Sequence, residues 1–321
     1  MHFLHRCISL TVLLAALCLA PSASQASNIG LSPEVSAIVD KIYSFDLDAA
    51  REDAHRFQRE HPDDPLGYLL EGEALWWNIF CTSADFKWGM TDARHRPKLE
   101  SDQHYFDLAV KAHALALEHT RHGESAEMYF YAGLADAFAA RLYALRGENR
   151  AAARAGVRGR QSFLRALELD PHLADADFGL GLYNYYVDTL SSFARMLRFF
   201  MGIPSGSKQE GVRQLERAIS SGALTPTVAR IYLALNLHRY DQQYARALEF
   251  LAPVAQKYSS NPLFQLMIGD LQAKLGHKDR ALLHYGAAAA LPLADADCRK
   301  RIQTLAHSAA AVAGSDPPRK Q

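Results

Sequence analysis

The sequence predicts an all-α fold built from about six successive helix pairs, followed by a C-terminal capping helix. Apolar residues recur at helical rather than alternating spacing. Hydrophobic residues make up 49% of the chain, which suits a packed helical protein. Capping residues followed by proline punctuate the chain, and each such pair can start a helix. They are Ser32-Pro33, Asp64-Pro65, Asp170-Pro171, Thr225-Pro226 and Asn261-Pro262.

The clearest helix pair occupies residues 261–292. Its first helix has a leucine-rich apolar face, with Gly269 where a neighbouring helix must come close. Its second helix presents a small-large-small stripe of Ala281, Tyr285 and Ala288. This pattern resembles the tetratricopeptide repeat family, and FLRALELDP at residues 163–171 is a second such signature. The resemblance implies an all-helical solenoid, a tetratricopeptide-like superhelix, that holds a partner on its concave surface.

The domain organisation follows from composition. Residues 1–26 resemble a secretory signal peptide, since a short apolar run from position 8 to 20 precedes a small-residue cleavage site ending at Ala26. Residues 27–313 then form the solenoid, interrupted by a long loop at 81–97 and an insertion at 187–208. Residues 294–313 suit a last helix covering the open end, and residues 314–321 are expected to be a disordered tail.

The signal peptide predicts an exported protein, periplasmic or secreted after cleavage. A lipid anchor on Cys18 is the alternative, but Leu17 stands where a small residue is expected, so soluble export is favoured. Of the four cysteines, Cys81 and Cys298 stay in the mature chain. Because segments so far apart in a solenoid do not touch, we expect two free thiols and no structural disulfide.

Composition and motifs disfavour several function classes. Lys plus Arg and Asp plus Glu are both 35, so no basic excess indicates a nucleic-acid-binding protein. The sequence has no G-x-S-x-G motif, Cys-His nucleophile pattern or dinucleotide fingerprint, so we expect no enzyme activity and no cofactor. His113, His119 and His122 lack zinc-site spacing and neighbour Arg121, so we expect no metal site.

The insertion contains an amphipathic helix. Phe193, Leu197 and Phe200 share one face, and Phe199 points away from it. The segment is too short and too charged to span a membrane. Two alternatives stay open: a helix packed on the solenoid's own core, or a partner-binding or membrane-surface element. The second makes residues 190–203 the basis of an alternative function, a membrane-peripheral assembly factor.

The family resemblance also implies candidate binding residues, because the first helix of each pair lines the concave surface. Carried over residue by residue, these are Glu73, Trp77, Phe130, Tyr185, Asn236, Arg239 and Asp270. Aromatic and arginine side chains are good anchors for protein or peptide partners. For each residue, ordinary packing between repeats is the alternative. The sequence therefore predicts a non-enzymatic scaffold that binds protein or peptide partners, without identifying them.

Overall fold

The structure, a computed structural model, describes residues 29–87, 90–93, 96–190 and 202–315. Thirteen α-helices lie in these ranges, together with one π-helical turn and one β-hairpin. The elements are α1 (Pro33–Tyr43), α2 (Leu47–Glu60), α3 (Pro65–Ser83), β1 (Ala84–Lys87), β2 (Met90–Ala93), α4 (Asp102–Arg121), α5 (Ala126–Leu145), α6 (Asn149–Leu169), α7 (Asp175–Asp188), α9 (Lys208–Ser221), α10 (Pro226–Asn236), η1 (Leu237–Asp241), α11 (Tyr244–Lys257), α12 (Pro262–Lys274), α13 (Lys278–Ala290) and α14 (Ala296–Gly314).

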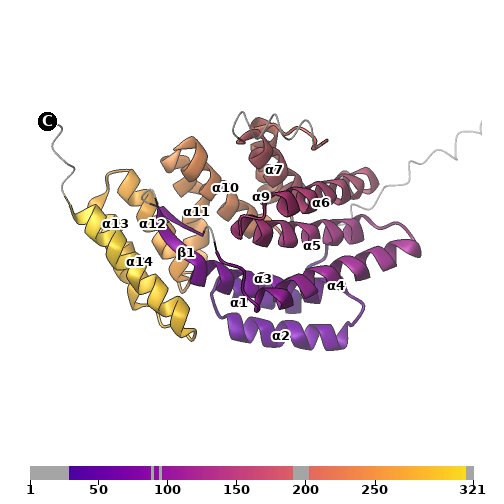
Figure 1. Ribbon diagram of the computed structural model, residues 1–321, viewed down its shortest axis with the longest axis horizontal. Helices are drawn as coiled ribbons and strands as arrows, with labels where there is room; N and C mark the ends of the chain where they lie inside the picture. The colour runs from indigo at the N-terminus through magenta and orange to yellow at the C-terminus, as the bar shows by residue number, and fades with distance from the viewer. Residues whose placement is uncertain (1–28, 88–89, 94–95, 191–201, 316–321) are drawn as a thin grey trace, which may run out of the picture.

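The helices pack in chain order, as the predicted all-α fold of successive pairs requires. Helix α5 packs on α6, α7 on α9 and α12 on α13, while α14 covers α13 at the C-terminal end. Figure 1 shows the result as a curved array, with α13 and α14 at one end, α4 to α6 at the other, and α1 to α3 between them. The helical-repeat architecture predicted from the sequence is therefore confirmed.

Local capping explains where several helices begin. The side chains of Ser32, Asp64 and Asn261 each accept a hydrogen bond from a backbone N–H of the helix that follows, and a proline occupies the next position. Ser125 and Ser207 cap α5 and α9 in the same way. Such caps satisfy backbone donors that have no partner within the helix, so these boundaries are set by nearby residues.

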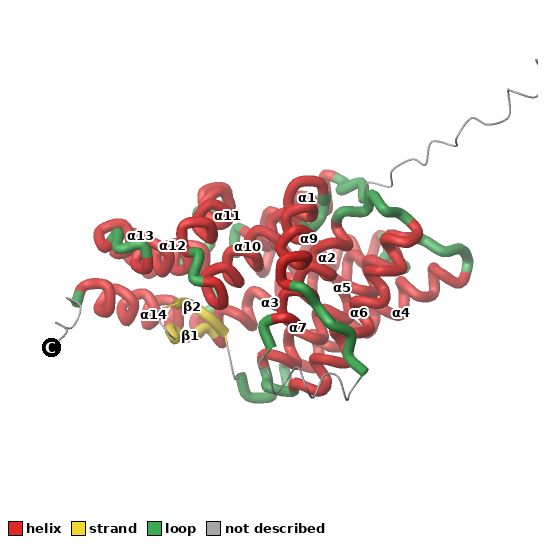
Figure 2. The backbone as a smooth tube through the Cα atoms, turned by 90° about the horizontal axis from the view of Figure 1, so that it is seen from above, coloured by secondary structure: helices red, strands yellow, loops and turns green. Residues whose placement is uncertain are grey.

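Two predicted boundaries differ from the structure. Asp170-Pro171 does not open a helix, because Asp170 accepts a hydrogen bond from the backbone N–H of His172 (2.9 Å) in a turn, and α7 begins only at Asp175. The segment 81–97, predicted as a long loop, contains the end of α3 and then the hairpin. Its strands β1 and β2 pair antiparallel, with Ala84 opposite Ala93. The hairpin lies against α14 (Figure 2).

Glycines lie where helices approach closely, as the sequence predicted for Gly269. A Cβ added to Gly269 would stand 2.5 Å from a ring carbon of Tyr285 on α13. At Gly133 the corresponding distance to the ring of Phe163 on α6 is 2.6 Å. Both glycines therefore allow an aromatic ring to pack directly on a helix backbone.

We expect Gly269→Val to destabilise the protein by on the order of 1–3 kcal/mol, because the ring of Tyr285 has no room to move away from a branched side chain. Urea denaturation followed by circular dichroism measures the effect. Gly286→Ala on α13 is the matched control, since nothing lies within 4 Å of a Cβ added there. It should stabilise the helix slightly. Equal effects of the two substitutions would contradict the packing argument.

The N-terminal helices α1 and α3 contact the C-terminal helices of the chain, which the sequence did not predict. Near α1, Tyr258 and Lys257 at the end of α11 both donate to Asp40 (2.7 and 2.9 Å), and the Asn261 side chain donates to the Tyr43 carbonyl (3.0 Å). At α3, the ring of Trp77 packs edge-on against Phe264 of α12, with centroids 5.4 Å apart. We call this set of contacts the closure interface.

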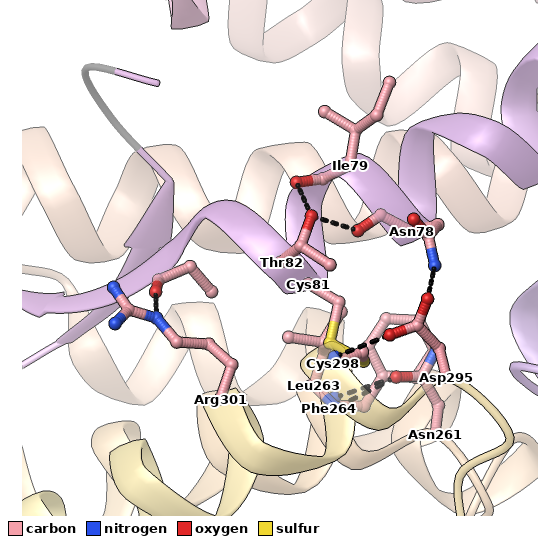
Figure 3. Close-up of a disulfide and its surroundings, with 11 residues drawn as sticks. Asn78, Ile79, Cys81, Thr82, Asn261, Leu263, Phe264, Asp295, Cys298 and Arg301 are labelled. Carbon is pink, nitrogen blue, oxygen red and sulfur yellow. Dashed lines mark hydrogen bonds between the residues drawn. A yellow bond between two sulfur atoms is a disulfide. The ribbon is translucent and has the colours of Figure 1, made fainter. Parts of the chain in front are cut away.

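A disulfide between Cys81 and Cys298 completes the closure interface, so the expectation of two free thiols was wrong. It joins the end of α3 to α14, with Cα atoms 5.4 Å apart across a sequence separation of 217 residues. Figure 3 shows the neighbouring contacts: Asn78 donates to Asp295 (3.0 Å), and Arg301 donates to the Ala84 carbonyl. The error arose from assuming an open rod, whereas the helix pairs curve enough to bring α12 and α14 back against α3.

Candidate functional site

The residues predicted on the concave surface lie on α3, α5, α7, α10, η1 and α12, but most are inaccessible. Trp77, Phe130, Tyr185, Asn236 and Asp270 are at most 3% exposed. The Glu73 side chain is 13% exposed, and Arg239 is half-buried. Their role in partner binding stays a prediction. Their burial favours the alternative interpretation, packing between repeats.

The contacts of these residues explain their burial. Glu73 pairs with Arg141 of α5 (2.7 Å) and accepts a hydrogen bond from the Trp77 indole (3.2 Å). The hydroxyl of Tyr185 donates to Asp241 (2.6 Å), and Asp270 accepts from the hydroxyl of Tyr285 (3.0 Å). The polar groups named here bond to the chain itself, so the inner side of the array is largely packed with its own side chains.

The insertion residues Phe193, Leu197, Phe199 and Phe200 lie outside the described residues, so their role stays a prediction. The flanking segments do contact each other. The Tyr183 hydroxyl donates to the Pro204 carbonyl (2.9 Å), and the Lys208 backbone N–H donates to Asp188 (2.8 Å). Among the described helices, none combines the length and apolar character that crossing a bilayer requires.

A groove of about 860 Å³ runs along α5 on the side formed by the second helices of the pairs. Helix α5 lies between α4 and α6 (Figure 1) and contacts both, and its residues Ala135, Asp136 and Ala139 line the groove. This volume falls within the range of typical ligand pockets, about 300–1,000 Å³. The groove is lined by Lys98, Leu99, Glu100, Asp102, Gln103, Phe106, Ala109, Val110, His113, Ala114, Ala135, Asp136, Ala139, Tyr143, Arg146, Glu148 and Arg158.

One wall of the groove is an apolar face of α4. Phe106, Ala109, Val110 and Ala114 recur at helical spacing along it and face small residues of α5. Val110 is 68% exposed and Leu99, at the start of this wall, is 44% exposed. Together with Phe106 and Ala114, these side chains form an apolar surface beside the recess, which is a feature of candidate interaction sites. From Asp102 to Ala114 the wall is about 18 Å long, enough for a peptide segment of a few turns.

Buried carboxylates fix the groove at both ends. Asp102, 1% exposed, pairs with Arg96 and lies 3.7 Å from the guanidinium of Arg146. At the other end Asp136, 4% exposed, accepts two hydrogen bonds from Arg158 (2.6 and 2.9 Å). Charge-assisted bonds of this kind are strong and hold the arginine heads in place. These ion pairs hold Arg96, Arg146 and Arg158 at the ends of the groove.

His113 adds a titratable group to the wall. Its Nε2 lies 3.5 Å from the second carboxylate oxygen of Asp136, and its side chain is 32% exposed. The ring thus stands between a buried carboxylate and the open groove. Sequence reasoning considered His113 only as a metal ligand and missed this placement. The apolar spacing on α4 did not predict the groove, because nothing local distinguishes a groove wall from a core face.

A second polar cluster lies at Glu71 of α3, outside the groove. Its carboxylate accepts from Gln58 (2.8 Å) and contacts the Nε2 atoms of His55 (2.9 Å) and His104 (2.7 Å). Burial opposes ionisation, but these hydrogen bonds outweigh it and hold the pKa of Glu71 below its ordinary value. The cluster links α2, α3 and α4 and provides hydrogen-bond partners for the buried carboxylate of Glu71.

His238 on η1 provides a pH-dependent contribution to stability. Burial, together with the nearby positive charge of Lys274, lowers the pKa of His238 to about 4. The unfolded chain takes up this proton near pH 6.5 while the folded chain stays neutral. We therefore expect stability to fall as the pH drops from about 6.5 to about 4, by on the order of 2–3 kcal/mol from this residue.

Urea denaturation at pH 7.5, 6, 5 and 4.5 tests this expectation against His238→Leu, which fills a similar space and cannot titrate. As the pH falls, the unfolding free energy of the wild type should decrease relative to that of the variant, because only the wild type contains His238. A difference that is constant across this range would show that His238 titrates alike in both states.

Comparisons with known proteins do not identify a function, so the function is inferred from the geometry of the groove. No protein-family model matches the chain, and no curated protein matches it. Among solved structures, the crystal structure of yeast Tom70 aligns with 87% of this chain and 88% of that chain, at 11% identity and a TM-score of 0.29. A superposition at that level carries no argument, so the groove is interpreted from its own residues.

Proposed function

We propose that the protein is an exported, non-enzymatic scaffold that binds a segment of a partner protein in the groove along α5. The observation that carries the proposal is a recess of about 860 Å³ with an exposed apolar wall and buried, charge-paired ends. Such a mixture suits a peptide, whose apolar side chains fill the recess while its backbone meets polar groups at the rim. The concave-surface version of this hypothesis is less well supported, because its candidate residues are buried.

Export is part of the proposal. The predicted signal peptide supports it, and so does the Cys81–Cys298 disulfide, since such bonds persist mainly in oxidising compartments. A periplasmic or extracellular partner is therefore the kind to seek.

A photo-crosslinking amino acid at Val110 tests the proposal in cells, with the same group at Leu283 as the control. Both positions are exposed apolar sites, 68% and 71%, but Leu283 lies on α13, away from the groove. We expect a discrete adduct from Val110 only. Mass spectrometry identifies the partner, and its affinity is then measured with purified proteins.

The decisive measurement uses two further variants. Ala114→Arg places a long charged chain at the groove wall and should weaken binding by about tenfold or more, equivalent to about 1.4 kcal/mol. Leu283→Glu should leave the affinity unchanged. Equal adducts at Val110 and Leu283, or an affinity that Ala114→Arg does not alter, would overturn the assignment of the groove as the binding site.

A further inference from the structure

We infer that the groove selects an acidic, amphipathic segment, with its apolar side chains on α4 and its carboxylates on α6. This inference rests on the proposed function and adds the chemistry of the partner. The groove has two unlike sides: α4 offers Phe106, Val110 and Ala114, whereas α6 contributes Arg158 to the lining and carries Arg150 and Arg154 on the same side of the helix. An occupant that satisfies both must itself have one apolar face and one acidic edge.

The positive charge of α6 is unusual within this chain. The helix holds five arginines, at positions 150, 154, 158, 160 and 165, and its first acidic residue is Glu168 near its end. Arg150, Arg154 and Arg158 are all exposed. Spaced four residues apart, they lie on one side of the helix, where like charges repel one another. The chain as a whole is neutral, so this ridge is a local concentration of charge.

Two of these arginines, Arg150 and Arg154, differ from the other arginines on the second helices in the ion pairs they form. Arg158 binds Asp136, and Arg165 pairs with both Glu124 and Glu168. On the next second helix, α9, Arg213 pairs with Glu210 and Arg217 with Asp177. Among the described residues, Arg150 and Arg154 have no ion pair, hydrogen bond or ring contact. Their guanidinium groups are therefore available to an outside carboxylate.

Arg154 lies one turn before Arg158, which lines the groove, so it stands on the α6 rim, with Arg150 a further turn along. The groove's own carboxylates do not compete for them: Asp102 and Asp136 are buried and paired, and Glu148 pairs with Arg146. At the Asp102 end of the groove, the exposed side chains of Lys98 and Glu100 carry opposite charges. The acidic edge of the occupant must therefore follow α6.

A recess also favours a segment over a membrane surface. An anionic bilayer presents a flat face that would meet the arginine rim without filling a hollow of about 860 Å³. The peptide is thus the occupant that uses both walls, and anionic lipid becomes an alternative outcome of the test.

The test measures fluorescence anisotropy of three labelled 15-residue helical peptides with the oxidised mature chain. All share a Leu and Ala apolar face, and their polar faces carry Glu, Gln or Lys. We expect the Glu peptide to bind about tenfold more tightly than the Gln peptide at low salt, the Lys peptide to bind weakest, and the preference to shrink as salt rises. Vesicles of phosphatidylglycerol and phosphatidylcholine are measured in parallel.

Variants make the result specific to the site. Arg150→Glu with Arg154→Glu changes two exposed, unpaired side chains and should reverse the preference between the Glu and Lys peptides. Ala114→Arg should weaken all three peptides, and Arg246→Glu on α11 is the distant control. If the Glu and Gln peptides bind equally and Ala114→Arg weakens both, the charge inference fails while groove binding stands. If no peptide binds, or only anionic vesicles do, the peptide inference fails, and the crosslinking at Val110 decides the proposed function separately.

Discussion

Replacing both Cys81 and Cys298 with alanine is expected to lower the thermal unfolding midpoint of the mature chain by roughly 5–10 °C. The disulfide closes a loop with a sequence separation of 217 residues, one of the largest this chain allows. In the chain-entropy model, closing such a loop lowers the entropy of the unfolded state and so raises its free energy by about 5 kcal/mol. Alanine is preferred to serine because both sites are fully buried, and a hydroxyl there would add an unrelated cost.

Differential scanning calorimetry of the oxidised wild type, the reduced wild type and the double variant measures the effect. The unfolding midpoints of the reduced wild type and the double variant should agree within a few degrees. Each single variant should have the same midpoint as the double variant, since either substitution prevents the disulfide. An unchanged midpoint would mean that the noncovalent closure interface alone holds α14 against α3. Hydrogen exchange should locate the loosening in α13 and α14, which lose their covalent tie to α3.

Arg141→Met is expected to cost on the order of 3 kcal/mol, because it leaves the carboxylate of Glu73 without its cationic partner. The guanidinium of Arg141 lies 2.7 Å from Glu73, donates to the hydroxyl of Tyr105 (2.6 Å) and stacks over Trp76 at 4.4 Å. Burial works against the charged form, yet the charge of Glu73 outweighs it and raises the pKa of Arg141. This single side chain therefore joins α3, α4 and α5.

Urea denaturation with the disulfide intact measures this prediction, and the double variant Glu73→Leu, Arg141→Met is its control. Removing both charges replaces a buried ion pair with apolar groups, so the double variant should be more stable than Arg141→Met alone. If the two substitutions simply add, or if Arg141→Met costs less than about 0.5 kcal/mol, the pair does not hold the inner side together.

Prediction from the sequence was most accurate where structure depends on near neighbours. The starts at Pro33, Pro65 and Pro262 follow from a capping side chain and a proline within three residues. The close approach at Gly269 was also predicted, because the surrounding apolar spacing places this small residue on the packed face of its helix. At Asp170-Pro171 the same signal failed, because Asp170 used its side chain to hold a turn instead of a helix start.

The candidate site was not predicted, because its parts are local but its shape is not. Val110 and Ala114 have the same spacing as residues of a core face. They line a groove only because of where α5 and α6 pack relative to α4. Conversely, Phe130 and Tyr185 were predicted at a concave surface and are fully buried. Whether a helical stripe faces a neighbour or solvent depends on how the next helix crosses it.

The sequence by itself determined the helical class, the order of the pairs and most helix starts, since apolar period and capping act within a few residues. Only the tertiary structure decided that α1 and α3 meet α11, α12 and α14, that Cys81 bonds Cys298, and that α4 and α6 enclose a groove. The physical reason is that each helix pair turns by a small angle relative to the one before it. Closure depends on the sum of those angles, which no single stretch of sequence contains.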